Sequence, residues 1–175
     1  MSLSHTVLLV GSTAWLVLLA GCDGVTAPQS CTTFFATGDR TGWQLEGESV
    51  ALHVASGTRW YRCPAGMVWA ASRCQGQALR TDWDSAVAYA EEFSEKSGLS
   101  WSLPSNRQFG AIQESGCNNP SLNPQVLGGL EVDNYWTSTR TLHNARFRCT
   151  LYTHGGEVDC RENRENPHPF FLIID

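Results

Sequence analysis

The sequence predicts an α+β domain with an antiparallel sheet and several disulfide bonds. Strand patterns come first, two helical patterns follow, and strands return after a long polar segment, which differs from the strand–helix alternation of a parallel sheet. Seven cysteines among 175 residues indicate a cross-linked chain. Charged residues make up 17% of the chain, and this low share excludes a disordered chain or a long solvated coiled coil.

The first 22 residues indicate export. Residues 6–19 are apolar but too few to span a bilayer, which takes about 20 helical residues. They lead into Leu19-Ala20-Gly21-Cys22, which resembles the lipobox of bacterial lipoproteins and implies lipidation of Cys22. We expect a signal peptide over residues 1–21, a tether over 22–30 and a lipid anchor in the membrane. An ordinary secretory leader cut near Ala20 is the alternative.

Two further features bear on location and partners. Asp23 resembles the signal that retains lipoproteins in the inner membrane of enteric bacteria. We therefore expect the protein in the bacterial cell envelope, on the periplasmic face of the inner membrane or in the outer membrane. The formal net charge is −5, without a run of like charge, so nucleic acid is not an expected partner.

A strand and a hairpin are expected before the helices. Apolar residues alternate with others over 49–55, which predicts a strand. Residues 59–74 have two short apolar runs around Pro64-Ala65-Gly66, which predicts a hairpin with a turn at these residues. A disulfide between Cys63 and Cys74 would close it.

Two helices are expected next. A Thr-x-x-Asp cap at Thr81 begins the first, and Gly98 ends it. Ser105 begins the second, with Gln108 completing a reciprocal capping box. We expect this second helix to continue to Gly116.

The second half of the domain is expected to be a loop followed by strands. Residues 117–133 are rich in Asn, Pro, Ser and Gly, which indicates a loop. A two-residue turn at His154-Gly155 would place Cys149 directly opposite Cys160. The expected strands are 135–139, 145–152, 157–161 and 170–174.

Six cysteines remain after Cys22, an even number that three disulfides would use completely. The expected pairs are Cys63–Cys74, Cys149–Cys160 and, from the remainder, Cys31–Cys117. With the first bond fixed, the other four cysteines still allow three arrangements. Zinc is the competing use, but the Cys-x₂-Cys spacing of zinc sites is absent. We expect no metal, no cofactor and, without a free thiol, no cysteine-based enzyme.

A series of short motifs resembles the DUF1566 or Lcl C-terminal-like family of bacterial envelope domains. The motifs are Cys63-Pro64-x-Gly66-x-x-Trp69, Trp83-x-x-Ala86, Trp101-x-Leu103-Pro104-Ser105-x-Arg107, Asn119-Pro120-x-Leu122-Asn123 and Tyr135-Trp136-Thr137-Ser138. The resemblance implies a domain over 59–175, with 31–58 as an extension packed on it. The order of elements is also similar to the C-type lectin-like fold.

The resemblance implies recognition without naming a ligand. The family occurs mainly in secreted and surface proteins, one of which is an adhesin that binds sulfated glycosaminoglycans. The net charge of −5 argues against such a polyanion here. The Glu-Pro-Asn, Gln-Pro-Asp and Trp-Asn-Asp tripeptides of calcium-dependent lectins are absent from the sequence.

One basic concentration is the best candidate for ligand binding. Arg146 and Arg148 would share a face of the strand 145–152 and could bind a carboxylate or sulfate through two hydrogen bonds. The competing interpretation is a solvated strand face, offset by Glu157 and Asp159 across the hairpin. The complete candidate set is Asn134, Arg140, His143, Asn144, Arg146 and Arg148.

Aromatic residues are a second candidate. Tyr135 and Trp136 could stack on a sugar ring, but a central strand favours core packing for both. The same core position is expected for Trp69, Trp83 and Trp101. We expect a non-catalytic envelope lipoprotein that presents residues 117–144 to a glycan or an envelope protein. The alternative is a structural or accessory subunit of an envelope assembly.

Overall fold

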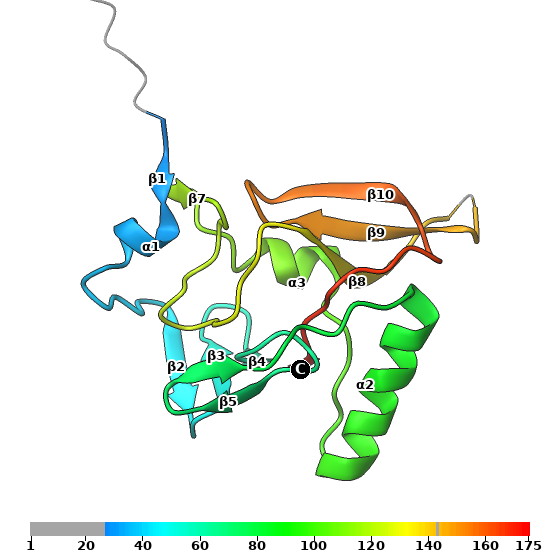
Figure 1. The fold of residues 1–175 in the computed structure, drawn as a ribbon, viewed down its shortest axis with the longest axis horizontal. Coiled ribbons are helices and arrows are strands. Elements are labelled where there is room, and N and C mark those ends of the chain that lie inside the picture. Colours follow the sequence, from blue (N-terminus) through cyan, green and yellow to red (C-terminus); the bar gives the residue numbers. More distant parts are fainter. Residues whose placement is uncertain (1–26, 143) are drawn as a thin grey trace, which may run out of the picture.

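The computed structural model describes residues 27–142 and 144–175. The expected leader, Cys22, Asp23 and His143 lie outside these residues. Two antiparallel sheets dominate the fold, and the short helix α3 (Asn106–Gly110) lies between them (Figure 1). One sheet has the order β11-β4-β3-β2, with β2 Trp43–Glu46, β3 Val50–His53, β4 Thr58–Tyr61 and β11 Ile173–Ile174. The other has the order β10-β9-β8, with β8 Asn134–Arg140, β9 Phe147–Tyr152 and β10 Glu157–Asn163.

The antiparallel α+β class is therefore confirmed. The expected strand at 49–55 forms as β3. The segment expected to be an extension, 31–58, packs on the domain and also supplies β2 and β3 to the four-stranded sheet. Its short elements are α1 (Cys31–Phe34) and, just before it, β1 (Gln29–Ser30), which pairs in parallel with β7 (Cys117–Asn118).

The predicted hairpin over 59–74 is wrong in its pairing. β4 pairs with β3 on one side and with β11 on the other. Thr58 and Trp60 are buried, so one face of this strand packs into the core. The hairpin is shorter and lies later in the chain, between β5 (Val68–Ala70) and β6 (Arg73–Gln75). Its turn is Ala71-Ser72 and not the Pro64 segment.

The first helix, α2 (Trp83–Ser97), ends at Gly98 as predicted, and Gly98 has the left-handed φ of 71° that favours glycine there. Its cap is Asp82 and not Thr81. The Asp82 carboxylate accepts hydrogen bonds from the Ser85 backbone N–H (2.9 Å) and hydroxyl (2.7 Å). Aspartate is among the preferred N-cap residues, and its side chain is the one that reaches the exposed amide.

The second helix, α3, begins with the predicted box, in which both Ser105–Gln108 capping bonds form. It ends at Gly110, six residues before the predicted end at Gly116. After Gly110 the backbone bonds tighten to the i→i−3 type, at Ile112 and Gln113, and the Glu114 N–H then donates to the carbonyl of Ser121 in the following loop (3.0 Å). A long-range partner thus replaces the bond to an earlier turn.

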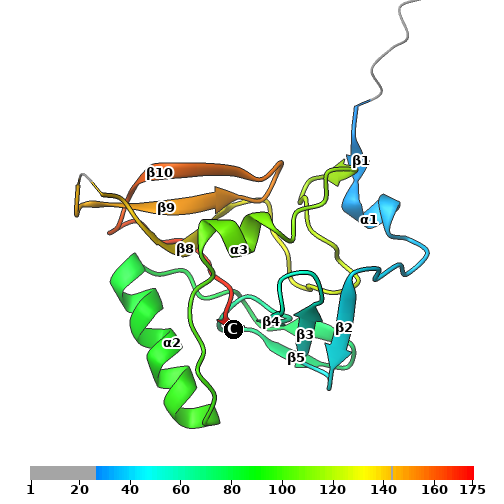
Figure 2. The ribbon, with the colours of Figure 1, turned by 180° about the vertical axis from the view of Figure 1, so that it is seen from behind.

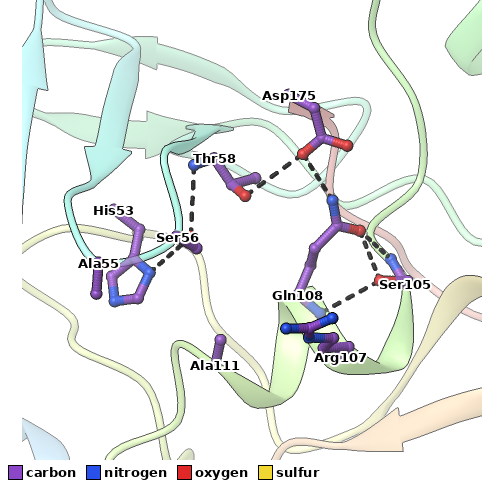
Figure 3. A pocket seen from close by; sticks show the side chains of 9 residues that line it. All are labelled: His53, Ala55, Ser56, Thr58, Ser105, Arg107, Gln108, Ala111 and Asp175. Carbon is purple, nitrogen blue, oxygen red and sulfur yellow. Dashed lines mark hydrogen bonds between the residues drawn. The ribbon is translucent and has the colours of Figure 1, made fainter.

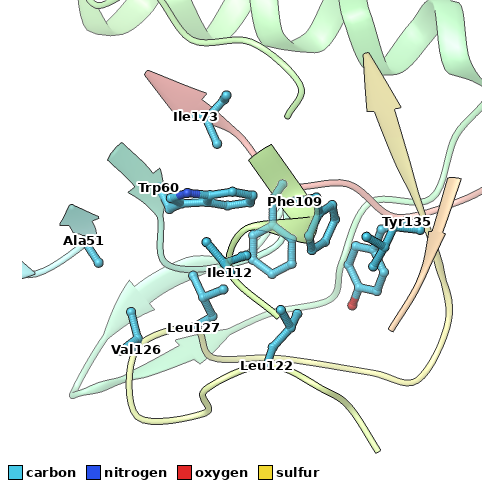
Figure 4. Close-up of a cluster of buried hydrophobic side chains, with 11 residues drawn as sticks. Ala51, Trp60, Phe109, Ile112, Leu122, Val126, Leu127, Tyr135 and Ile173 are labelled. Carbon is cyan, nitrogen blue, oxygen red and sulfur yellow. The ribbon is translucent and has the colours of Figure 1, made fainter. Parts of the chain in front are cut away.

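The main core lies between the sheets and around α3 (Figure 4). Trp60 of β4, Phe109 of α3 and Tyr135 of β8 meet there. The expected loop 117–133 also enters this core. Its fully buried residues are Leu122, Val126 and Leu127. Most of the loop is therefore part of the scaffold, and the expectation that the whole of 117–144 is presented to a partner is wrong.

The three expected disulfides are all present. They are Cys31–Cys117, Cys63–Cys74 and Cys149–Cys160. In the hairpin of β9 and β10, Tyr152 pairs with Glu157 and Thr150 with Asp159, which is the register that a turn at His154-Gly155 predicts. The expected core positions are confirmed for Tyr135, Trp136, Trp83 and Trp101, whereas Trp69 is only half-buried.

Candidate functional site

Two of the predicted ligand-binding arginines come together at one end of the three-stranded sheet. Arg140 of β8 and Arg148 of β9 are direct partners across the two strands. Both guanidinium groups lie over the ring of Trp83, the first residue of α2, at 4.4 Å for Arg148 and 5.3 Å for Arg140. We call Trp83, Asp84, Arg140, Arg148 and Arg164 the arginine–tryptophan cluster.

Arg148 is the buried member of the cluster. Arg148 is 7% exposed, and its Nη1 donates to the carbonyls of Ala145 and Phe147, both at 2.8 Å. Its buried Nε has no hydrogen-bond partner among the described residues. Burial lowers the pKa of Arg148, as do the positive charges of Arg164 and Arg140.

The solvated-face interpretation is wrong for Arg148. Glu157 and Asp159, the acids expected to offset it, lie opposite Tyr152 and Thr150. The arginine itself packs on the indole ring, where a planar and weakly hydrated guanidinium is well accommodated.

The cluster contains three arginines and one acid, Asp84, and a second acid, Glu162 of β10, lies opposite Arg148 in the strand register. Arg164 forms an ion pair with Asp84 (Nη2–Oδ2 3.0 Å), and this is the one ion pair within the cluster among the described residues. Arg140 and Arg148 form no ion pair there, although Asp84 does raise the pKa of Arg148 slightly against the effects of burial. Arg140 is exposed, so its guanidinium has N–H groups available to an external anion.

A cavity of ≈ 300 Å³ opens beside the cluster. On the side of α2 its lining is apolar except for the exposed Glu91, and on the side of β8 it includes Ser138 and Arg140. The lining residues are Trp83, Val87, Ala90, Glu91, Trp101, Ser102, Leu103, Ser138 and Arg140. An arginine at the rim of an aromatic wall can bind an acidic group while the wall contacts an apolar face of the same ligand.

The remaining predicted residues do not join this site. Asn134 begins β8, six residues from Arg140 and roughly 20 Å away along an extended strand. Asn144 has a local role, because its Oδ1 accepts from the Arg146 N–H (2.9 Å). Arg146 precedes β9 and is exposed, so it does not share a strand face with Arg148, and that prediction is wrong. His143 lies outside the described residues.

A cavity of ≈ 670 Å³ lies elsewhere, and no sequence signal pointed to it (Figure 3). It opens between α3 and the turn after β3. Asp175 Oδ1 accepts from Gln108 Nε2 (2.6 Å) and from the Thr58 hydroxyl (3.4 Å). These segments meet only because β11, close to the chain end, pairs with β4.

This cavity contains a histidine and serines but no assembled catalytic group. His53 Nδ1 lies 2.9 Å from the hydroxyl of Ser56, which is three residues later in the chain. The His53 ring packs against Trp43, with centroids 4.9 Å apart, and burial lowers its pKa. Among the described residues no carboxylate forms an ion pair with His53, so the third group that would orient a catalytic base is missing.

Within 27–142 and 144–175, no three His, Cys, Asp or Glu side chains gather as they would to bind a metal ion. No helix in the same ranges has both the length and the apolar character needed to cross a bilayer.

Together, these observations define a disulfide-linked α+β domain in which two arginines pack on a buried tryptophan beside a cavity. The family model of the Lcl C-terminal domain matches residues 49–173 of this chain. The chain therefore belongs to the Lcl C-terminal domain family, the DUF1566-like domains, and this membership indicates a bacterial surface-associated protein. The match begins ten residues before the expected boundary at 59, so it includes β3. No curated protein and no solved structure matches the chain.

Proposed function

We propose that this chain is a non-catalytic envelope lipoprotein whose domain binds an acidic group of a glycan at the arginine–tryptophan cluster. The observation that carries the proposal is the pair of guanidinium groups over Trp83, those of Arg140 and Arg148, neither of which forms an ion pair among the described residues, since Asp84 pairs with Arg164. A site of this charge attracts an anion.

The two arginines over Trp83 have different roles in this proposal. Arg140 is exposed at the cavity rim and donates directly to the ligand. Arg148 lies buried behind it, held by two backbone carbonyls, and contributes a fixed positive charge. The half-buried Val87, with the small exposed parts of Trp83 and Trp101, forms the apolar part of the lining against which an apolar face of the sugar packs.

Binding is tested with the full chain on a glycan array that contains neutral, carboxylated and sulfated glycans. We expect acidic glycans to bind, and Arg140→Ala to weaken binding about tenfold because a charge-assisted hydrogen bond is lost. Arg107→Ala, which removes an exposed arginine on α3, is the matched control. An array without signal, or equal losses in both variants, contradicts the proposal.

The arrangement of elements supports a C-type lectin-like fold as part of this proposal. Two helices precede a long segment, and a three-stranded sheet follows in which Cys149–Cys160 joins two strands. The last strand, β11, then returns to β4. An experimental structure that shows a different connection of these elements would contradict this part.

The lipid anchor is proposed on the sequence alone. Cys22 carries the lipid, and the domain is held at the inner or outer membrane of the envelope. Mass spectrometry of the N-terminal peptide should show a diacylglyceryl group on Cys22, and Cys22→Ser should release the protein from the membrane fraction. An unmodified Cys22 would support the ordinary secretory leader.

The absence of catalysis is also a proposal, and it rests on the cysteines. All six cysteines of the described residues form disulfides, so none is available as a nucleophile. Thiol titration of the denatured, unreduced protein should find no free thiol among these six. Two free thiols would revive a cysteine-based enzyme.

An assembly subunit is the second candidate, and one surface feature favours it. Leu142 is 94% exposed beside an apolar cavity of ≈ 430 Å³ that Phe147 also lines. Exposed apolar surface of this kind often contacts another protein. A stoichiometric envelope partner that is lost in Leu142→Asn, while Arg140→Ala retains it, would favour this function over glycan binding.

A further inference from the structure

A separate cavity of ≈ 430 Å³ opens where five segments of the chain meet. They are the residues before β2, the turn between β2 and β3, the end of β4, the β5–β6 hairpin and the long segment after β7. The lining residues are Arg40, Leu45, Gly47, Glu48, Arg62, Trp69, Ala71, Ser72, Pro124 and Gln125. None of them belongs to the arginine–tryptophan cluster.

Arg62 is the buried cation of this cavity. It is 4% exposed, and its guanidinium lies 3.6 Å above the centre of the half-buried Trp69 ring. It donates to three backbone carbonyls: Val126 from Nε (2.8 Å), Glu48 from Nη1 (2.9 Å) and Gln125 from Nη2 (3.3 Å). The guanidinium is therefore fixed in orientation by neutral groups.

Arg40 brings a second guanidinium to the same place. Its Nε donates to the carbonyl of Gln125 (3.1 Å), which Arg62 also uses. Among the described residues, neither arginine has a carboxylate within ion-pair distance. Glu48 is the single acid in the lining, so the cavity wall carries a net positive charge. The two arginines together have ten N–H groups, of which these bonds use four.

The turn of the β5–β6 hairpin forms another part of the lining. Ala71 and Ser72 have φ values of 51° and 61°, as a two-residue hairpin turn requires at its two central residues. This turn places Ser72 in the lining of the cavity.

We propose that this cavity is a binding site for the carboxylate of a small acidic sugar. A guanidinium matches a carboxylate in plane and spacing, and two unpaired guanidiniums supply the charge. The cavity volume falls in the usual range for small-molecule sites. Leu45, Pro124 and the exposed part of Trp69 provide an apolar wall for the ring, and the Ser72 hydroxyl is a partner for a sugar hydroxyl.

The test is calorimetric titration of the full chain, purified in mild detergent, with glucuronate, glucose and acetate. We expect glucuronate to bind, glucose not to bind, and acetate to bind more weakly than glucuronate. Arg40→Ala should weaken glucuronate binding about tenfold, whereas Glu48→Gln should strengthen it several-fold because a like charge is removed. Both side chains are exposed, so both variants should fold. Arg161→Ala on β10 is the matched control.

Three outcomes would overturn the proposal. The first is no binding of glucuronate up to about 20 mM, above the range of weak but specific sites. The second is equal affinity for acetate and glucuronate, which rejects the sugar. The third is loss of glucuronate binding in Arg140→Ala but not in Arg40→Ala, which would assign the sugar to the arginine–tryptophan cluster. Because the two sites share no residue, either can fail while the other stands.

Discussion

Two buried arginines are accommodated in the interior by the same kinds of contact. Arg62 lies on Trp69 and Arg148 lies on Trp83, and each donates to backbone carbonyls. A buried charge without an opposite charge is costly, and an aromatic face with carbonyl oxygens offsets part of that cost. Arginine suits this position better than lysine because its charge is delocalised and weakly hydrated.

A pair of substitutions at Arg148 tests whether this residue stabilises the fold. We expect Arg148→Met to change the free energy of unfolding by less than about 1 kcal/mol, because methionine keeps the apolar packing and removes repulsion from Arg140 and Arg164. Arg148→Lys should cost more, since a compact ammonium needs more hydration. Urea unfolding at neutral pH measures both. The reverse order would show that the charge itself stabilises the domain.

A glycine in the long segment is a second test at this scale. A Cβ atom on Gly128 would lie 2.8 Å from Cys74 Sγ and 3.3 Å from Trp69 Cζ3. We expect Gly128→Ala to lower the free energy of unfolding by about 1–3 kcal/mol, because the segment can no longer pack on the β5–β6 hairpin. Gly110→Ala is the control, since its Cβ would meet no atom within 4 Å and should be neutral or slightly stabilising. Equal effects in thermal unfolding would reject this explanation.

At the scale of elements, the sequence predicted the Ser105–Gln108 capping box and the helix end at Gly98. It did not predict the end of α3 or the pairing of β4. The Ser105–Gln108 box and the stop at Gly98 depend on neighbours within one turn, so the sequence pattern is enough to find them. Just after α3, the Glu114 N–H donates to the carbonyl of Ser121, seven residues later in the chain, and not to a carbonyl of the helix. The pairing of β4 depends on β11, more than a hundred residues later, and no local pattern contains that information.

The cap of α2 gives a prediction with a pH dependence. Hydrogen bonds from Ser85 hold the pKa of Asp82 below its ordinary value of 3.8. The folded-state pKa is thus lower than the unfolded-state pKa, so the stabilisation is complete above 3.8 and is lost as pH falls through the folded value. We expect Asp82→Ala to cost about 1 kcal/mol at neutral pH and less in acid, as measured by urea unfolding.

Asp82→Asn separates the cap from its charge. An asparagine accepts the same backbone hydrogen bond but does not titrate, so the difference in free energy of unfolding between Asp82→Asn and Asp82→Ala should depend little on pH. A loss in Asp82→Ala that stays constant from neutral pH to well below 3.8 would show that the carboxylate charge plays no part in the cap.

At the scale of the whole molecule, Cys31–Cys117 has the largest expected effect on stability. It closes 86 residues, whereas the other two disulfides each close 11. Chain entropy then gives about 4–5 kcal/mol for the long loop and about 3 kcal/mol for a short one. We expect the double variant Cys31→Ser, Cys117→Ser to lower the guanidinium midpoint more than Cys149→Ser, Cys160→Ser does.

The comparison has a clear opposite outcome. Phe35 packs with Cys31 and Cys117 in a small cluster of its own, apart from the main core. If removal of Cys31–Cys117 lowers the guanidinium midpoint no more than removal of Cys149–Cys160, the unfolded chain is already compact. This packing and the β2–β3 strands would then restrict the N-terminal segment without the disulfide.

The candidate sites show how far local reasoning reaches. Arg140 and Arg148 were found because they are close in sequence and their strands form a hairpin-like pair. Trp83, which both arginines cover, was assigned to the core with no link to them, since it lies on a helix some sixty residues earlier. The cavity of Arg40, Arg62 and Trp69 was missed for the same reason.

The sequence alone established the antiparallel α+β class, an even set of six cysteines and one expected pair, Cys63–Cys74, and its motifs pointed to the family by resemblance; the structure chose the other two pairs from three arrangements. These properties follow from short-range rules: helix caps, strand alternation, cross-strand register and an even count of cysteines. The packed tertiary structure added the burial of the long segment, the β4–β11 pairing and both cationic cavities. Each depends on contacts between residues far apart in sequence, and such contacts form only when apolar surfaces from separate elements share one core.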